Sequence, residues 1–157
     1  MATKYQHVMF ATDLNNKNSN IGIEAAQEAQ DLANLFSAKF SLLHVVQPIA
    51  SAYGYIGDYG LEKQLVQEAQ IQMEKISKEL NVNEENTYII EGQPKEDIIN
   101  FSKEVNVDLL VLQGHRHHFL GILGSTANTV INKAECDVMV LATGKNKLTL
   151  QQYYDRP

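Results

Sequence analysis

Apolar residues in this chain follow two patterns that alternate along the sequence. Short, nearly continuous apolar runs predict buried strands at 7–12, 40–46, 87–91, 107–113 and 138–141. Between these runs, apolar residues recur at spacings of three and four, which predicts helices at about 19–37, 61–80, from about 95, and at 125–133. The run from Leu109 to Leu112 is too continuously apolar for a strand with one wet face, so we expect it inside a sheet covered on both sides.

The order of these elements predicts an α/β fold. Strands separated by helices favour parallel pairing with right-handed crossovers, because parallel neighbours need a long connection. We therefore expect a five-stranded parallel sheet with helices on both faces, formed by residues 1–143 and followed by a tail at 144–157. Ligands of such sheets bind at the carboxyl ends of the strands, where the strand order reverses. The segments after Thr12, Val46, Glu91 and Gln113 are thus the places to expect a site.

Length and charge narrow the class of protein. A chain of 157 residues fits one domain, and its 13 basic against 19 acidic residues give a net charge of −6. That sign disfavours nucleic acid as a partner. The first residues show no charged segment before an apolar run, and no apolar stretch is long enough for a membrane span. A lone cysteine, Cys136, cannot form an internal disulfide, which fits a reducing compartment. Together these features lead us to expect a cytoplasmic protein without membrane or nucleic-acid partners.

The segment from Gly114 to Thr126 leaves an inner strand and enters a helix. The first N–H groups of that helix, near Ser125 and Thr126, lack partners within the helix and could hold an anion such as phosphate. The residues alone favour a simpler interpretation, in which Ser125 caps the helix. Phosphorylation of Ser125 or Thr126 is a further hypothesis, because a helix N-terminus favours negative charge. The sequence Gly-Lys-Ser/Thr of a P-loop is absent.

Other reactive residues offer little support for catalysis or metal binding. His115, His117 and His118 form a cluster without a neighbouring cysteine or acid, so we predict no physiological metal site. His7 and His44 fall inside predicted strands and are interpreted as core residues. Cys136 is better explained by packing than by reactivity. No serine or cysteine nucleophile with a paired base can be assigned, so we expect no catalytic residue.

Several sequence segments together resemble the universal stress protein family. The amino half contributes a strand ending at Asp13 and the string Leu42-Leu43-His44-Val45. The carboxyl half contributes Asp108-Leu-Leu-Val-Leu-Gln-Gly114, then Gly124-Ser125, then Ala134-Glu-Cys-Asp-Val-Met-Val-Leu141. The resemblance covers about residues 5–142. It implies a Rossmann-like fold of the adenine nucleotide hydrolase-like type.

The family contains members that bind ATP and members that do not. The ATP-binding pattern has two glycines three positions apart and, after a longer segment, Gly-Ser or Gly-Thr. This chain departs from the pattern at three points. His117 stands in the position of the second glycine, and Ala127 stands in the position of the last serine of Gly-Ser-x-Ser. Only nine residues lie between Gly114 and Gly124, which is fewer than the pattern has there. A bulky imidazole where the backbone should approach phosphates disfavours a triphosphate.

The segment 114–119 instead resembles the universal stress protein A class, which does not bind nucleotide. That resemblance implies a non-catalytic stress-response protein without a favoured cofactor. It also implies a homodimer joined through the last strand, by Val138, Met139, Val140 and Leu141. Self-pairing of this strand would cover an exposed sheet edge.

Two alternatives remain open. The first is a member that binds ATP or AMP and acts as a nucleotide-gated regulator or slow ATPase; its site would consist of Asp13, Val45, Gly114, Arg116, Gly124, Ser125 and Thr126. The second is a protein-interaction module that uses the aromatic loop at 53–59 and the tail tyrosines Tyr153 and Tyr154.

Overall fold

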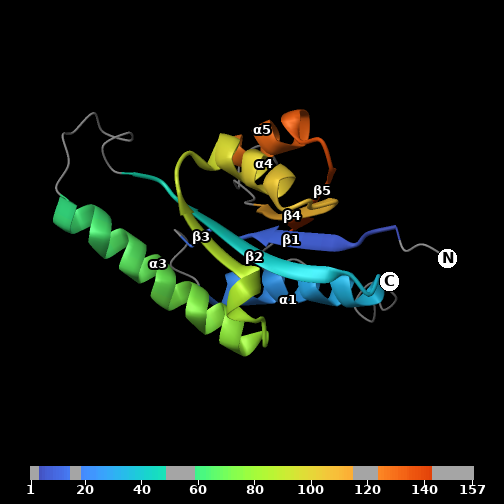
Figure 1. The fold of residues 1–157 in the computed structure, drawn as a ribbon, viewed down its shortest axis with the longest axis horizontal. Helices are drawn as coiled ribbons and strands as arrows, with labels where there is room; N and C mark the ends of the chain where they lie inside the picture. Colours follow the sequence, from blue (N-terminus) through green and yellow to red (C-terminus); the bar gives the residue numbers. More distant parts are fainter. Residues whose placement is uncertain (1–3, 15–18, 49–58, 115–123, 143–157) are drawn as a thin grey trace, which may run out of the picture.

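The computed structural model describes residues 4–14, 19–48, 59–114 and 124–142, and Figure 1 shows their arrangement. The elements follow one another as β1 (His7–Ala11), α1 (Ser19–Leu35), β2 (Lys39–Val46), α3 (Tyr59–Glu79), a 3-10 turn (Glu84–Asn86), β3 (Thr87–Glu91), α4 (Pro94–Glu104), β4 (Leu109–Gly114), α5 (Ser125–Lys133) and β5 (Asp137–Ala142). In the described parts of the chain, strands and helices therefore alternate as the apolar pattern predicts.

The strands form one sheet in the order β3-β2-β1-β4-β5, and every neighbouring pair is parallel. The chain builds from β1 through β2 to β3 at one edge, then crosses back to place β4 on the other side of β1 and β5 at the far edge. The predicted five-stranded parallel sheet is thus confirmed. The strand order reverses between β1 and β4, and this is the place where open α/β sheets leave a crevice.

Helices cover both faces of the sheet, as predicted. Figure 1 shows α1 and α3 on one face and α4 and α5 on the other. Side chains alternate along β1 to serve the two layers: Val8 and Phe10 pack with α1 and α3, whereas Met9 packs with α4 and α5. All three are fully buried. The run from Leu109 to Leu112 in β4 is at most 5% exposed, because β4 lies between two strands and two helical layers.

The ends of the helices differ from the predicted ones for identifiable reasons. Helix α1 stops at Leu35, because Ser37 takes a left-handed conformation with φ of 52° that ends the helix. Helix α3 begins at Tyr59, and its first turns project past the sheet (Figure 1). Leu61, the first apolar residue of the predicted helix at 61–80, is therefore 44% exposed, while Met73 further along is buried.

The start of α4 is fixed by local chemistry. Pro94 occupies the first turn, where its missing N–H needs no partner, as the sequence predicts. The backbone N–H of Gln93 donates to Oδ2 of Asp97 at 2.6 Å, which satisfies a donor at the helix end. This arrangement holds Pro94 and Ile98 beside the carboxyl end of β2.

Among the described residues, no helix combines the length and the apolar character needed to span a membrane.

Candidate functional site

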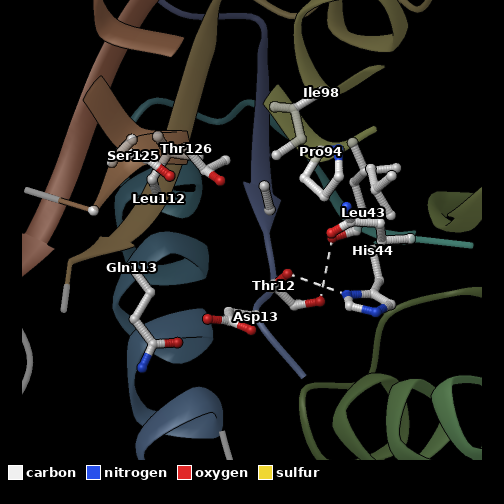
Figure 2. A pocket seen from close by; sticks show the side chains of 15 residues that line it. Thr12, Asp13, Leu43, His44, Pro94, Ile98, Leu112, Gln113, Ser125 and Thr126 are labelled. Carbon is white, nitrogen blue, oxygen red and sulfur yellow. Dashed lines mark hydrogen bonds between the residues drawn. The ribbon is translucent and has the colours of Figure 1, made fainter. Parts of the chain in front are cut away.

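A pocket of about 350 Å³ opens at the carboxyl ends of β1, β2 and β4 (Figure 2). It lies where the strand order reverses, the location that the topology predicts for a ligand. We call it the strand-end pocket. Its lining residues are Ala11, Thr12, Asp13, Leu43, His44, Val45, Gln47, Pro94, Ile98, Leu112, Gln113, Gly124, Ser125, Thr126 and Ala127.

The strand-end pocket has an apolar side and a polar side. Pro94 and Ile98 of α4 lie with Leu43 on one side in Figure 2. Asp13 and Gln113, at the ends of β1 and β4, and the first turn of α5 supply polar groups elsewhere. An apolar wall with a few polar groups is the usual make-up of a small-molecule site. The pocket therefore suits a ligand with one apolar part and one polar part.

Hydrogen bonds to β2 fix the end of β1. The N–H of Thr12 donates to the Leu43 carbonyl at 2.8 Å, and the Thr12 hydroxyl donates to the same oxygen at 3.3 Å. In return, Nδ1 of His44 donates to the Thr12 carbonyl at 3.2 Å (Figure 2). These three bonds hold the backbone directly before Asp13, so that the Asp13 carboxylate is presented to the pocket.

His44 has a second role that its position in a strand did not reveal. It is buried at 6% exposure, which confirms the prediction of a core position, but it also lines the strand-end pocket. Burial lowers the pKa of the His44 imidazole, against smaller raising effects of the Thr12 carbonyl and the Asp13 carboxylate. Because the Thr12 carbonyl can only accept, Nδ1 carries a hydrogen. His44 is therefore a neutral donor at neutral pH.

The start of α5 lies open to the pocket. The N-cap residue is Gly124, without a side-chain cap, and its carbonyl accepts from the N–H of Asn128 at 3.0 Å. Ser125 is already the first helical residue, so the predicted capping role of Ser125 is wrong. Ser125, Thr126 and Ala127 line the pocket, and N–H groups of a first helical turn have no partners within the helix. These groups can attract a negatively charged group.

The two glycines that flank the segment 115–123 have different reasons to be glycine. A Cβ on Gly114 would lie 3.0 Å from the Leu141 carbonyl oxygen and 3.0 Å from Cγ1 of Val140. Gly114 is therefore explained by the close approach of β5. A Cβ on Gly124 would meet nothing within 4 Å, and the φ of −56° is open to any residue. Packing does not explain Gly124, whose missing side chain leaves the start of α5 accessible.

Gln113 is a pocket residue that sequence reasoning did not identify. It is 8% exposed and lines the strand-end pocket, where its side chain points toward that of Asp13 in Figure 2. A signal was present: Gln113 is the polar residue that follows the apolar run Leu109–Leu112, at the carboxyl end of an inner strand.

The predicted nucleotide residues are partly brought together. Five of them line the strand-end pocket: Asp13, Val45, Gly124, Ser125 and Thr126. Gly114 ends β4 but does not line the pocket. Arg116 and the histidines at 115, 117 and 118 lie outside the described residues. Within the described residues, no group of three or more His, Cys, Asp or Glu is arranged to hold a metal ion.

Cys136 belongs to the core and not to this pocket. It is partly buried and packs against the cluster formed with α4 and α5, which confirms the packing interpretation. Burial raises the pKa of its thiol, which disfavours the reactive thiolate.

Comparison with known proteins identifies the class of this protein. The sequence profile of the universal stress protein family matches residues 4–142, almost the whole chain. The chain belongs to the universal stress protein family.

Individual relatives agree with this assignment. Universal stress protein A homolog 2 of Coxiella burnetii is 32% identical over 119 residues, which is 73% of this chain and 82% of that protein. Universal stress protein UspA from Lactobacillus plantarum has the same fold, with a TM-score of 0.71, 24% identity and coverage of 88% of this chain and 98% of that one. A putative universal stress protein from Pseudomonas aeruginosa UCBPP-PA14 matches with a TM-score of 0.70 and 19% identity. The match covers 91% of this chain and 49% of that longer chain, so this chain spans about half of its length.

Proposed function

We propose that this protein is a non-catalytic, homodimeric stress-response protein that does not hold ATP tightly. The observation that carries the proposal is the charge of the strand-end pocket. Its described lining contains no lysine or arginine, and its acidic residue, Asp13, has the same sign as phosphate. The start of α5 supplies only about half a positive charge. A triphosphate carries several negative charges, so this lining leaves most of them without compensation.

Two sequence features support the same conclusion. His117 stands where ATP-binding relatives have a glycine, and the segment between Gly114 and Gly124 is shortened to nine residues. Gly114 itself gives no support to nucleotide binding, because the approach of β5 already requires it. The retained part of the ATP pattern is therefore limited to Gly124-Ser125 at the start of α5.

The absence of catalysis is supported by the surroundings of a serine–histidine pair. Ser41 donates to Nε2 of His7 at 2.8 Å, the geometry of an activated nucleophile. However, Ser41 is 0% exposed and His7 is 5% exposed. Both lie near the amino ends of β1 and β2, at the opposite end of the sheet from the strand-end pocket. A substrate cannot reach this pair in the folded protein, so we assign it to packing.

Calorimetric titration of purified, nucleotide-free protein with ATP and magnesium tests the first proposal. We expect no measurable heat at low micromolar ligand, and no nucleotide in a mass spectrum of the untreated preparation. A dissociation constant in the micromolar range or tighter would overturn the proposal and assign ATP to the strand-end pocket.

The homodimer proposal rests on β5. This strand pairs with β4 on one side and forms the edge of the sheet on the other. Val138 and Val140 pack inward against the α4 and α5 layer, while Met139 is 37% exposed. An edge strand with apolar side chains is a ready surface for pairing with a second copy, and self-pairing would cover it.

Replacing Met139 with lysine tests this interface. A charged side chain on an edge strand opposes strand pairing, so M139K is expected to raise the dimer dissociation constant about tenfold or more. Analytical ultracentrifugation over a dilution series measures it. The matched control is L35K, which makes a similar change at a residue of α1 that is 78% exposed. Equal dimer stability in M139K and L35K would contradict a β5 interface.

A second candidate function is a regulator gated by an adenine nucleotide of low charge. It is favoured by the gathering of Asp13, Val45, Gly124, Ser125 and Thr126 around one pocket. The start of α5 suits a single phosphate group better than a chain of three. A universal stress protein of the same fold, at 21% identity and a TM-score of 0.55, has been solved in complex with cAMP, a nucleotide with one phosphate. This fold can therefore be built around such a ligand.

A further inference from the structure

We infer that the first turns of α3, which project past the sheet, dock a protein segment in which a lysine or arginine stands beside apolar residues. The docking surface consists of Leu61, Glu62, Leu65 and Val66, and we call it the α3 overhang. The inference goes beyond both candidate functions given above and rests on neither, because it concerns a surface outside the strand-end pocket and away from β5.

The first step is the apolar stripe of α3, which is longer than the core beneath it. Leu61 and Leu65 share one face of the helix with Met73, Ile76 and Leu80, because they recur at helical spacing. The cluster under α1 and α3 includes Met73, Ile76 and Leu80, whereas no overhang residue belongs to either cluster in the described parts of the chain. Figure 1 shows the reason, since the first turns of α3 lie beyond the sheet. The stripe therefore continues past the core.

The second step is a groove beside the overhang. Glu62, Leu65 and Val66 form its helical wall, and the ends of β2 and β3 form the other wall with Val46, Gln47, Pro48 and Glu91. The N–H of Gly92 donates to the Val46 carbonyl at 3.0 Å, which ties these two strand ends together. Single exposed apolar residues are common, but several on one face beside a groove indicate an interaction site.

The third step is the charge of the groove, which selects the partner. Its lining holds two carboxylates, Glu62 on α3 and Glu91 at the end of β3, and no lysine or arginine. Neither carboxylate forms an ion pair with a residue that the structure describes. A lysine or arginine of a partner would be attracted by both, and an acidic segment would be repelled. Two overhangs facing each other would bring four carboxylates together, which disfavours a second copy of this chain as the occupant.

A random dodecapeptide phage library panned against the full-length wild type tests this preference. We expect the enriched peptides to carry a lysine or arginine next to apolar residues. The most strongly enriched peptide is then synthesised with a fluorescent label and titrated by fluorescence anisotropy. In E91K we expect its dissociation constant to rise about fivefold or more, because an attractive charge pair becomes a repulsive one.

The matched control for E91K is E68K. It makes the same change in net charge at an exposed residue of α3 that does not line the groove. E68K therefore separates recognition by the groove from a general attraction of basic peptides to a protein of net charge −6. It should bind the peptide nearly as tightly as the wild type. Equal peptide affinities of E91K and E68K, enriched peptides without a basic residue, or no enriched peptide at all would each overturn the inference.

The variant L61S tests the apolar part of the surface and the other possible occupants. Leu61 is 44% exposed, so L61S should weaken the peptide about threefold or more and leave the urea midpoint and the dimer dissociation constant unchanged. The control is I71S, at a residue of α3 that is 67% exposed and lies outside the groove; it should change none of the three quantities.

Three results for L61S would overturn the inference. Unchanged affinity for the peptide would show that the apolar part of the overhang does not contact it. Unfolding at a clearly lower urea concentration than I71S would show that the protein's own chain already covers the overhang. A raised dimer dissociation constant would show that a second copy covers it.

Discussion

Replacing Gly114 with serine is expected to destabilise the protein by about 1–3 kcal/mol, the usual range for overpacking a close-packed interior. The new Cβ would lie 3.0 Å from the Leu141 carbonyl oxygen and 3.0 Å from Cγ1 of Val140. These atoms belong to β5, which is hydrogen-bonded to β4 and cannot withdraw without loss of pairing. Urea unfolding at a fixed protein concentration measures the loss.

The matched control is the same substitution at Gly124. A Cβ there meets no atom within 4 Å, and serine is a favoured N-cap residue, so G124S should be as stable as the wild type or slightly more so. If G114S unfolds at the same urea concentration as G124S, the packing explanation of Gly114 is wrong. A role for Gly114 in ligand binding would then have to be considered again.

Acidification is expected to destabilise the protein in the pH range just below about 6.5, the ordinary pKa of histidine. Burial is the main cause that lowers the pKa of both His7 and His44 in the folded protein. The unfolded chain therefore binds more protons than the folded one below pH 6.5. The stabilisation that the two neutral imidazoles contribute is complete above this pH, and it is lost as the pH falls toward their pKa values in the folded protein. Each histidine contributes at most about 1.4 kcal/mol per pH unit.

The local structure explains why protonation is unfavourable at both histidines. Nδ1 of His7 donates to the Val105 carbonyl at 3.1 Å, and Nε2 accepts from Ser41, so the neutral ring has all its hydrogen bonds. The Asp108 carboxylate raises the His7 pKa and Lys39 lowers it, but burial remains the largest cause. At His44, only the Thr12 carbonyl and Asp13 oppose burial. A positive charge at either site would be buried.

Urea unfolding of the wild type, H7Q and H44Q between about pH 8 and pH 5.5 tests this prediction. Each variant should lose part of the pH dependence, because glutamine does not titrate. If the wild-type free energy of unfolding does not change over this pH range, the pKa values of His7 and His44 are not lowered in the folded protein. If both variants keep the full pH dependence of the wild-type free energy of unfolding, that dependence comes from other titrating groups.

The fold could be predicted from the sequence because its signals are local and repeated. Apolar runs such as Leu109–Leu112 are typical of inner strands of a covered sheet, and their alternation with helical spacing favours parallel pairing. The location of a pocket followed from topology alone, at the carboxyl ends of β1 and β4. What failed was local detail: the first turns of α3 leave the sheet, and the N-cap falls on Gly124 instead of Ser125.

The content of the site was less predictable, because it depends on which side chains face a common space. Asp13 was identified through the family resemblance, and Ser125 and Thr126 through the predicted helix start; all three line the pocket. Gln113 was missed, because a glutamine at a strand end belongs to no motif, and only the structure shows that it lines the pocket. His44 was treated as core, since a strand position does not show that the strand ends at a pocket. Whether Arg116 contributes remains a prediction, as it lies outside the described residues.

The most direct test of the account is an NMR titration of the isotope-labelled protein with AMP and, separately, with ATP and magnesium. The second candidate function predicts that AMP shifts the backbone amide signals of Gly124, Ser125 and Thr126 at the strand-end pocket. It predicts weaker binding of ATP at the same residues. Shifts confined to other parts of the chain, or tighter binding of ATP than of AMP, would contradict a strand-end pocket built for a nucleotide of low charge.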